Sequence, residues 1–312
     1  MPAGPAPDWT FLSPADLAPT GPESSDADVP ALWQRLGLPG LADIHVHFLP
    51  RNMLAKVWQY FDQAEQHYGM AWPIHYRTSE ADRIATLAAL GVRRFPTLCY
   101  PHKPGMAAWL NGWCADFAVE HPEAVHSATF FAEPSAAADV RTALEAGARI
   151  FKVHVQVGGF DPGEDVLDQA WGLLAEARVP VVVHCGSGPL PGAHTGPGPI
   201  GLVLQRHPAL TAVIAHAGAP EYAEHLALLE RYRNVRLDTT MVGTGFMNRI
   251  APVPAEVLAQ YRDQGDRIVL GSDFPNIPYS YASQIQSLVE WGFGDDWLRR
   301  VLWHNGAALL GL

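Results

Sequence analysis

The chain has 312 residues, of which 48% are hydrophobic and 17% are charged, and its formal net charge is −11 at pH 7. The apolar share is large enough for a sizeable core, and the length suits a single α/β barrel of roughly 250 residues or more. The acidic balance argues against nucleic acid and anionic membranes as partners, because both attract surfaces rich in Lys and Arg.

Residues 1–38 are rich in Pro, Ala, Ser and Asp and show no apolar periodicity. This composition predicts a flexible or extended N-terminal arm. A different pattern begins near residue 39 and continues to residue 312, so these residues are predicted to form one domain.

In this second region, short runs rich in Val and Ile alternate with longer helical patterns. The predicted strands are 41–47, 92–99, 125–132, 148–155, 179–185, 211–216, 234–239 and 267–272. The clearest predicted helices are 80–90, 135–146, 164–177, 220–232 and 254–264. The first of these has a Ser before it and a Gly after it, which are typical helix boundaries. Eight strands alternating with helices predict a closed (β/α)₈ TIM barrel.

Two connections are longer than a barrel requires. Residues 48–79 contain many aromatic side chains, and we expect this insertion to cover the mouth of the barrel; the alternative is that it only packs against the barrel wall. Residues 186–201 are rich in Gly and Pro, which predicts a rigid, exposed loop at the carboxyl end of the strands. This loop lacks the Lys-Ser/Thr ending of a phosphate-binding loop, so no nucleotide is expected there.

Polar side chains follow several of the predicted strands. His45 and His47 share one face of the first strand, because alternate residues of a strand point the same way. His184 and His216 end the fifth and sixth strands, and Asp273 follows the eighth. A lone strand-end His is usually structural, but four of them with an Asp would meet at the carboxyl end of the barrel. One shared metal ion would satisfy all of these groups, each of which would cost about 1–3 kcal/mol if buried without a partner.

This pattern, with the "GSDFP" and "NGAALLGL" segments, resembles the amidohydrolase superfamily, in particular its amidohydrolase-related branch that includes aminocarboxymuconate-semialdehyde decarboxylase. The resemblance covers roughly residues 41–312. It implies that one divalent ion, with zinc as the expected metal, is bound by His45, His47, His184 and Asp273. It also implies that His216 lies beside the ion, where it orients or deprotonates water or ligates a second metal. Asp273 would accept a proton from metal-bound water and return it to the leaving group.

Lys152 and its neighbours leave alternatives open. A carboxylated Lys152 would bridge two metal ions, as in some superfamily members, whereas an unmodified Lys152 would bind a substrate carboxylate. His154 is a candidate substrate contact or a residue of the rim, and Arg51 is a candidate clamp for an anion or a surface salt bridge. His102, Glu133 and Asp238 are weaker candidates, for which a structural role is the default. Cys185 is predicted to belong to the core.

Three functions follow as hypotheses. The first is a hydrolase that opens an ester, lactone or amide bond of a small molecule with metal-bound hydroxide. The second is a metal-dependent decarboxylase or hydratase of an unsaturated or aromatic carboxylic acid. The third is a catalytically inactive barrel that acts as a binding protein. Three Cys residues without CxxC spacing, no recognisable signal peptide and no long apolar stretch predict a cytoplasmic protein, and the resemblance implies a homodimer.

Overall fold

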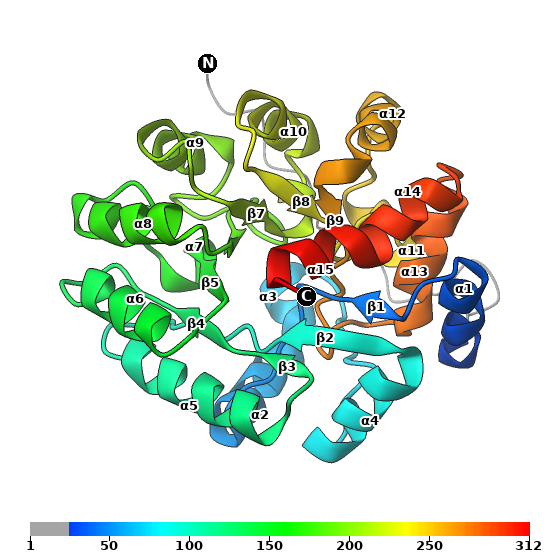
Figure 1. Cartoon of the computed structure of the whole chain (residues 1–312), viewed down its shortest axis with the longest axis horizontal. Coiled ribbons are helices and arrows are strands. Elements are labelled where there is room, and N and C mark those ends of the chain that lie inside the picture. Colours follow the sequence, from blue (N-terminus) through cyan, green and yellow to red (C-terminus); the bar gives the residue numbers. More distant parts are fainter. Residues whose placement is uncertain (1–24) are drawn as a thin grey trace.

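The computed structural model describes residues 25–312, which form a ring of parallel strands surrounded by helices (Figure 1). The strands are β1 (Leu41–Ala42), β2 (Val92–Pro96), β3 (Ala124–Val125), β4 (Ser127–Thr129), β5 (Ile150–His154), β6 (Val181–His184), β7 (Ala212–Ile214), β8 (Arg236–Asp238) and β9 (Ile268–Val269). All neighbouring pairs are parallel, in the orders β1-β2-β3 and β4 through β9.

Backbone hydrogen bonds complete the ring where the regular strands are short. The Ile44 N–H donates to the Leu270 carbonyl at 3.0 Å, and the His47 N–H donates to the Phe274 carbonyl at 2.7 Å, which joins the first barrel strand to the last. Just after β2, the Thr97 N–H donates to the hydroxyl of Ser127, the first residue of β4, at 2.9 Å, so a side chain replaces one ladder bond there. The predicted TIM barrel is confirmed, with β3 and β4 together forming its third strand.

The helices that follow the strands pack around this ring. They are α4 (Glu80–Leu90), α5 (Ala107–Glu120), α6 (Ala136–Glu145), α7 (Val155–Gly158), α8 (Asp165–Ala177), α9 (Pro197–Arg206), α10 (Tyr222–Arg231), α11 (Gly245–Ile250), α12 (Ala255–Asp263), α13 (Tyr281–Glu290), α14 (Asp295–Arg299) and α15 (Asn305–Leu310), with a π-helical segment at Arg300–His304. The five helices predicted from the sequence all occur, within two residues at either end. Ser79 caps α4 by accepting from the Asp82 N–H, and Gly91 ends it in a left-handed conformation.

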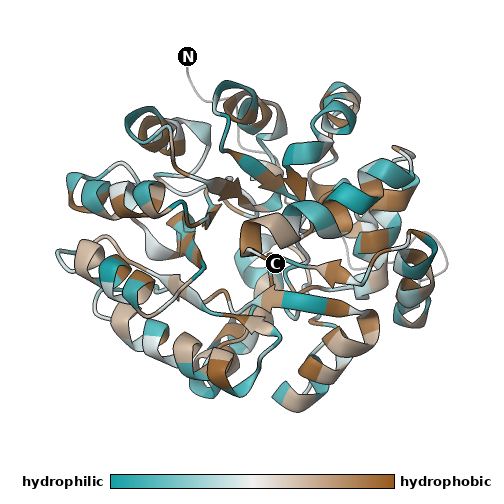
Figure 2. Ribbon diagram, in the orientation of Figure 1, coloured by the Kyte–Doolittle hydropathy of each residue, from teal (hydrophilic) through white to brown (hydrophobic). Residues whose placement is uncertain are grey.

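The hydropathy of the residues follows the arrangement of an inner ring of strands and an outer layer of helices (Figure 2). Most strand residues are buried: β5, β6 and β7 contain only buried residues, whereas β2 has an exposed Arg93. The surrounding helices turn apolar faces inward and polar faces outward, and they cover strands whose apolar residues outnumber the polar ones. No helix among residues 25–312 is long and apolar enough to span a membrane.

The strands are shorter than predicted; the first, for example, ends at Ala42 rather than at residue 47. Two further sequence predictions differ from the structure. Residues 26–28 form a 3₁₀ turn and Val29–Arg35 forms helix α1, so the described part of the predicted arm is helical and packed rather than extended. Its Asp26 carboxylate accepts from the Tyr76 hydroxyl at 2.5 Å and from the Ala282 N–H at 2.9 Å. The rest of the arm lies outside the described residues. The predicted loop 186–201 ends early, because α9 begins at Pro197, a residue suited to the first turn of a helix.

Candidate metal centre

Three side chains from two neighbouring strand ends bring their donor atoms together at the carboxyl end of the barrel. His45 and His47 follow β1, Asp273 follows β9, and one donor atom from each lies within 4.8 Å of the other two. Oδ1 of Asp273 lies 2.9 Å from Nε2 of His47 and 3.5 Å from Nε2 of His45. The structure therefore brings together three of the four residues that the sequence predicted as metal ligands.

The hydrogen bonds on the far side of each ring fix which nitrogen is free. Nδ1 of His47 lies 2.6 Å from the Leu98 carbonyl oxygen, and Nδ1 of His45 lies 2.8 Å from Oδ2 of Asp238. Because both partners are acceptors, each Nδ1 carries the hydrogen and each Nε2 of a neutral ring presents a lone pair. Two lone pairs and a carboxylate thus face one another, an arrangement that a divalent cation would satisfy.

The charges of these groups also suit a metal ion. Burial, together with the nearby Lys152 ammonium, lowers the pKa of His45 to about 3, so this imidazole is neutral. Burial alone would raise the pKa of Asp273, but the adjacent His47 ring and the other histidines around it hold the pKa well below its usual range. Neutral imidazole and ionised carboxylate are the protonation states that bind metals.

Asp238, the last residue of β8, connects the donor group to the neighbouring strand. Besides facing His45, its carboxylate accepts from the backbone N–H groups of His216 at 2.7 Å and Thr240 at 3.1 Å. Burial opposes ionisation, but the nearby His45 ring and its hydrogen bond lower the pKa of Asp238 to about 2. Asp238 was only a weak candidate from the sequence, and the available signal for it was its place at an inward-facing strand end.

The remaining strand-end histidines form a second group across the cavity. The His184 ring stacks on His154 with ring centroids 3.8 Å apart, and Nε2 of His184 donates to the Gly188 carbonyl at 3.1 Å. Among the described residues, the compact donor group does not include His184, which differs from the predicted ligand set. Nδ1 of His184 keeps a lone pair, because its Nε2 carries the hydrogen.

His216 lies between the two groups. Its ring centroid is 5.3 Å from that of His45 and 4.7 Å from that of His184. Burial lowers the pKa of His216, so its ring is neutral at neutral pH. The backbone of His216 has φ 55° and that of Asp273 has φ 69°, left-handed conformations that are uncommon outside glycine and that cluster at functional sites.

Lys152 occupies the floor of the site and Arg51 does not. Nζ of Lys152 lies 3.0 Å from Nε2 of His45, and burial lowers the pKa of this amine to about 8. This position is compatible with both interpretations of Lys152, as a modified metal ligand or as a substrate contact. Arg51 is exposed at the first residue of helix α2 (Arg51–Phe61) and is not among the residues that line the cavity.

The weaker candidates from the sequence lie in different parts of the structure. His102 lines the cavity, whereas the Glu133 carboxylate accepts from the Gly105 N–H at 2.9 Å and thereby holds a loop. Cys185 is buried beside His225, with Sγ and Nε2 3.8 Å apart, which agrees with the predicted core position.

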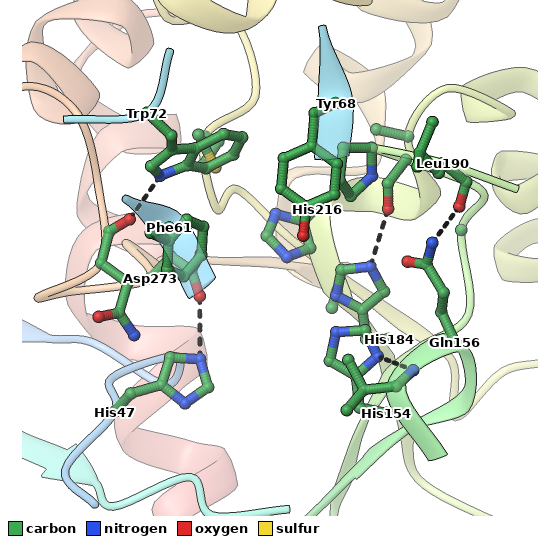
Figure 3. A pocket seen from close by; sticks show the side chains of 18 of the residues that line it. His47, Phe61, Tyr68, Trp72, His154, Gln156, His184, Leu190, His216 and Asp273 are labelled. Carbon is green, nitrogen blue, oxygen red and sulfur yellow. Dashed lines mark hydrogen bonds and ion pairs between the residues drawn. The ribbon is translucent and has the colours of Figure 1, made fainter. Parts of the chain in front are cut away.

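A cavity of about 530 Å³ lies above the donor group. In Figure 3, His47 and Asp273 line one side, His154 and His184 line the other, and His216 and Tyr68 lie between them. The insertion 48–79, which contains α2 and α3 (Ala64–Tyr68), forms much of the outer wall, so it covers the barrel mouth as expected. Asn276 anchors this insertion through two hydrogen bonds. Its side-chain oxygen accepts from Trp58 Nε1 at 3.1 Å, and its backbone carbonyl accepts from Trp72 Nε1 at 2.7 Å.

Comparisons with known proteins agree with this architecture. The family described as Amidohydrolase matches residues 42–312. A TIM-barrel protein of unknown function, Bb4693 from Bordetella bronchiseptica, is 18% identical with a TM-score of 0.72, covering 87% of this chain and 98% of its own. A 5-carboxyvanillate decarboxylase from Novosphingobium aromaticivorans, solved with manganese and 4-hydroxy-3-methoxy-5-nitrobenzoic acid, is 16% identical with a TM-score of 0.59, covering 88% and 96%.

A probable 2-pyrone-4,6-dicarboxylic acid hydrolase from Acinetobacter baumannii, solved with citric acid, is 14% identical with a TM-score of 0.58, covering 88% of this chain and 100% of its own. No curated protein matches the chain. At these identities the structural likenesses show a shared fold, and the match to the family rests on the sequence.

Proposed function

The chain belongs to the amidohydrolase family, and from this premise we propose that it is a metal-dependent hydrolase of an ester, lactone or amide bond in a small molecule. The observation that carries the proposal is the convergence of His45 Nε2, His47 Nε2 and Asp273 Oδ1, with both ring tautomers fixed from behind. One divalent ion, with zinc as the first candidate, suits this mixed set of imidazole and carboxylate donors.

The bound ion would polarise the substrate carbonyl and acidify water at neutral pH. The chain's own residues would then move the protons. Asp273, ionised and facing the cavity, accepts the proton of the attacking water and returns it to the leaving oxygen or nitrogen. His216, neutral and next to the donor group, orients that water through its ring nitrogen.

Other residues hold this machinery in place. Asp238 keeps His45 in the tautomer that leaves Nε2 free, and the same carboxylate fixes the backbone of His216. Lys152 lies beside His45, where a carboxylated side chain would extend the donor set to two ions and an unmodified one would hold a substrate carboxylate.

Non-oxidative decarboxylation of an unsaturated or aromatic acid is the second candidate. The observation that favours it is the apolar character of most of the cavity wall, which includes Met70, Trp72 and Ile250. An ionised carboxylate is costly to bury in such surroundings, and the loss of carbon dioxide removes that charge.

The test combines metal content with product analysis. Protein purified without chelator is expected to contain about one divalent ion per chain by elemental analysis, and His47→Ala to lose it. His207→Ala is the matched control, because His207 pairs with Asp168 outside the cavity and its loss leaves the donor group intact. About two ions per chain would instead indicate a carboxylated Lys152.

Two substrate panels then separate the reactions. Release of acid from lactones and esters supports hydrolysis, and release of carbon dioxide from aromatic acids supports the second candidate. If the chain binds no metal even after reconstitution, both enzymatic proposals fail and an inactive binding barrel is favoured.

A further inference from the structure

We infer that the outer part of the cavity is a binding site for an uncharged hydrocarbon or aryl group, so that the substrate carries an apolar tail away from its reacting end. The inference rests on the proposed function only for the reacting end. Four of the chain's six methionines line this one cavity, namely Met53, Met70, Met241 and Met247. Methionine side chains are flexible and polarizable, and they adapt to apolar ligands of irregular shape.

The polar and apolar residues of the cavity come from different segments. The polar floor, with His45, Lys152 and Asp273, comes from strand ends. The apolar wall comes mainly from the insertion 48–79 and from the segment 241–251 that contains α11, with Val157 of α7 at its edge. A ligand whose carbonyl reaches the floor would therefore place its other end between these two segments.

This wall is one packed unit. The Trp72 ring lies 5.4 Å from that of Phe61 and 5.0 Å from that of Phe246 of α11, measured between centroids. Trp72 thus connects the insertion with α11, and its indole N–H is already bonded to the Asn276 carbonyl. The surface that this cluster offers to a ligand is accordingly carbon and sulfur rather than a free polar group.

The charged groups of the cavity argue against a second anionic group on the substrate. Among the lining residues there is no arginine, and the lysines are Lys152 at the floor and Lys56 of α2. Two lysines at different places give no bidentate clamp of the kind that arginine provides for a carboxylate. A carboxylate at the far end of a ligand would lose hydration against the apolar wall and would meet at most the single ammonium of Lys56.

Two apolar side chains of the wall are exposed at the cavity mouth. Tyr60 of α2 is 47% exposed and Val157 of α7 is 43% exposed, and both line the cavity. A bound tail would cover them and gain the corresponding hydrophobic free energy. Each buried methylene is worth about 0.8 kcal/mol, which corresponds to about fourfold in affinity.

The experiment measures binding of three probes by titration calorimetry: benzoate, 4-butylbenzoate and terephthalate. We expect 4-butylbenzoate to bind at least about 30-fold more tightly than benzoate, since its four added carbons would be at least partly buried. Terephthalate, with a second carboxylate at the same ring position, should bind no better than benzoate. The titrations are run on the full chain with and without chelator, so that the result does not depend on the proposed metal chemistry.

Paired variants locate the site. Val157→Gln and Tyr60→Gln should each reduce the ratio between 4-butylbenzoate and benzoate several-fold, whereas Val157→Ile and Tyr60→Phe should keep it. Gln59→Glu, on an exposed position of α2 outside the cavity lining, should leave the ratio unchanged. Equal affinity for benzoate and 4-butylbenzoate, tighter binding of terephthalate, or no binding of 4-butylbenzoate would overturn the inference. A missing metal would overturn the proposed function and leave these ratios unaffected.

Discussion

The carboxylate of Asp238 lies 2.8 Å from Nδ1 of His45, and both side chains are buried. The pair joins the seventh strand of the barrel to the first, and it decides which His45 nitrogen faces the donor group. Carboxylates in this position raise the basicity of a ligating imidazole and fix its orientation, and their loss typically reduces metal affinity 10–100-fold.

Asp238→Asn is therefore expected to lower zinc affinity by about 10–100-fold, measured by competition with a chromophoric chelator. Asp168→Asn is the matched control, because Asp168 also bonds an imidazole, that of His207 at 2.9 Å, but lies outside the cavity lining. If Asp238→Asn binds zinc as tightly as the unaltered chain, Asp238 does not support the donor group.

His216 is expected to separate catalysis from metal binding. Its ring neighbours the donor group without belonging to it, so His216→Asn should keep the metal content while kcat falls by about 10²–10⁴-fold. Elemental analysis and steady-state kinetics on the same preparation give both quantities. Loss of the ion from this variant would instead make His216 a ligand.

Asp43 predicts a pH dependence of stability. Its Oδ1 accepts from the His45 N–H at 3.0 Å and its Oδ2 from the Tyr281 hydroxyl at 2.9 Å, yet burial outweighs these bonds and raises its pKa from 3.8 to about 7. Between these two pH values the folded chain binds more protons at Asp43 than the unfolded chain does. Its contribution to the free energy of unfolding is therefore fully present below pH 3.8 and is lost as the pH rises towards 7.

The comparison with Asp43→Asn isolates this contribution. Denaturant unfolding of chelator-treated protein between pH 5 and pH 8 should show the unaltered chain losing a few kcal/mol relative to Asp43→Asn, since one pKa unit corresponds to about 1.4 kcal/mol. A constant difference between the two proteins across this range would show that Asp43 does not titrate with a raised pKa.

The sequence predicted the barrel because its signals are local and repeated. Ser79 caps α4 with its side chain, and Gly91 ends the helix with its left-handed backbone. The Val-rich sequence of β6 favours a buried strand, whichever residues pack against it. The same logic placed His45, His47 and Asp273 at one end of the barrel, because parallel strands share that end.

What the sequence did not predict depends on contacts between distant residues. The Gly188 carbonyl that occupies Nε2 of His184 comes from a loop whose path no local pattern determines. Likewise, the 3₁₀ turn before helix α1 is held by Asp26, which hydrogen-bonds Tyr76 and Ala282, partners 50 and 256 residues away. The composition of residues 1–38 predicted a flexible or extended arm, because composition carries no information about such distant partners.

Gly271 offers a test of how tightly the donor group is enclosed. A Cβ atom at this position would lie 2.3 Å from Oγ1 of Thr240 and 2.9 Å from Cβ of His45, both of them buried. Because Oγ1 of Thr240 lies 3.0 Å from Nδ1 of His45, Gly271→Ala would displace the ring from behind. We expect a loss of about 1–3 kcal/mol in the free energy of unfolding together with weaker zinc binding.

Gly112→Ala provides the contrast. Gly112 lies within α5, and a Cβ there would meet no heavy atom within 4 Å, so the substitution should stabilise the helix by about 0.5–1 kcal/mol and leave zinc affinity unchanged. Chemical denaturation and chelator competition on the two variants give both quantities. If Gly271→Ala unfolds at a lower denaturant concentration but binds zinc normally, the barrel end tolerates the shift and close packing does not position His45. If both quantities fall together, close packing behind the imidazole is part of what positions His45.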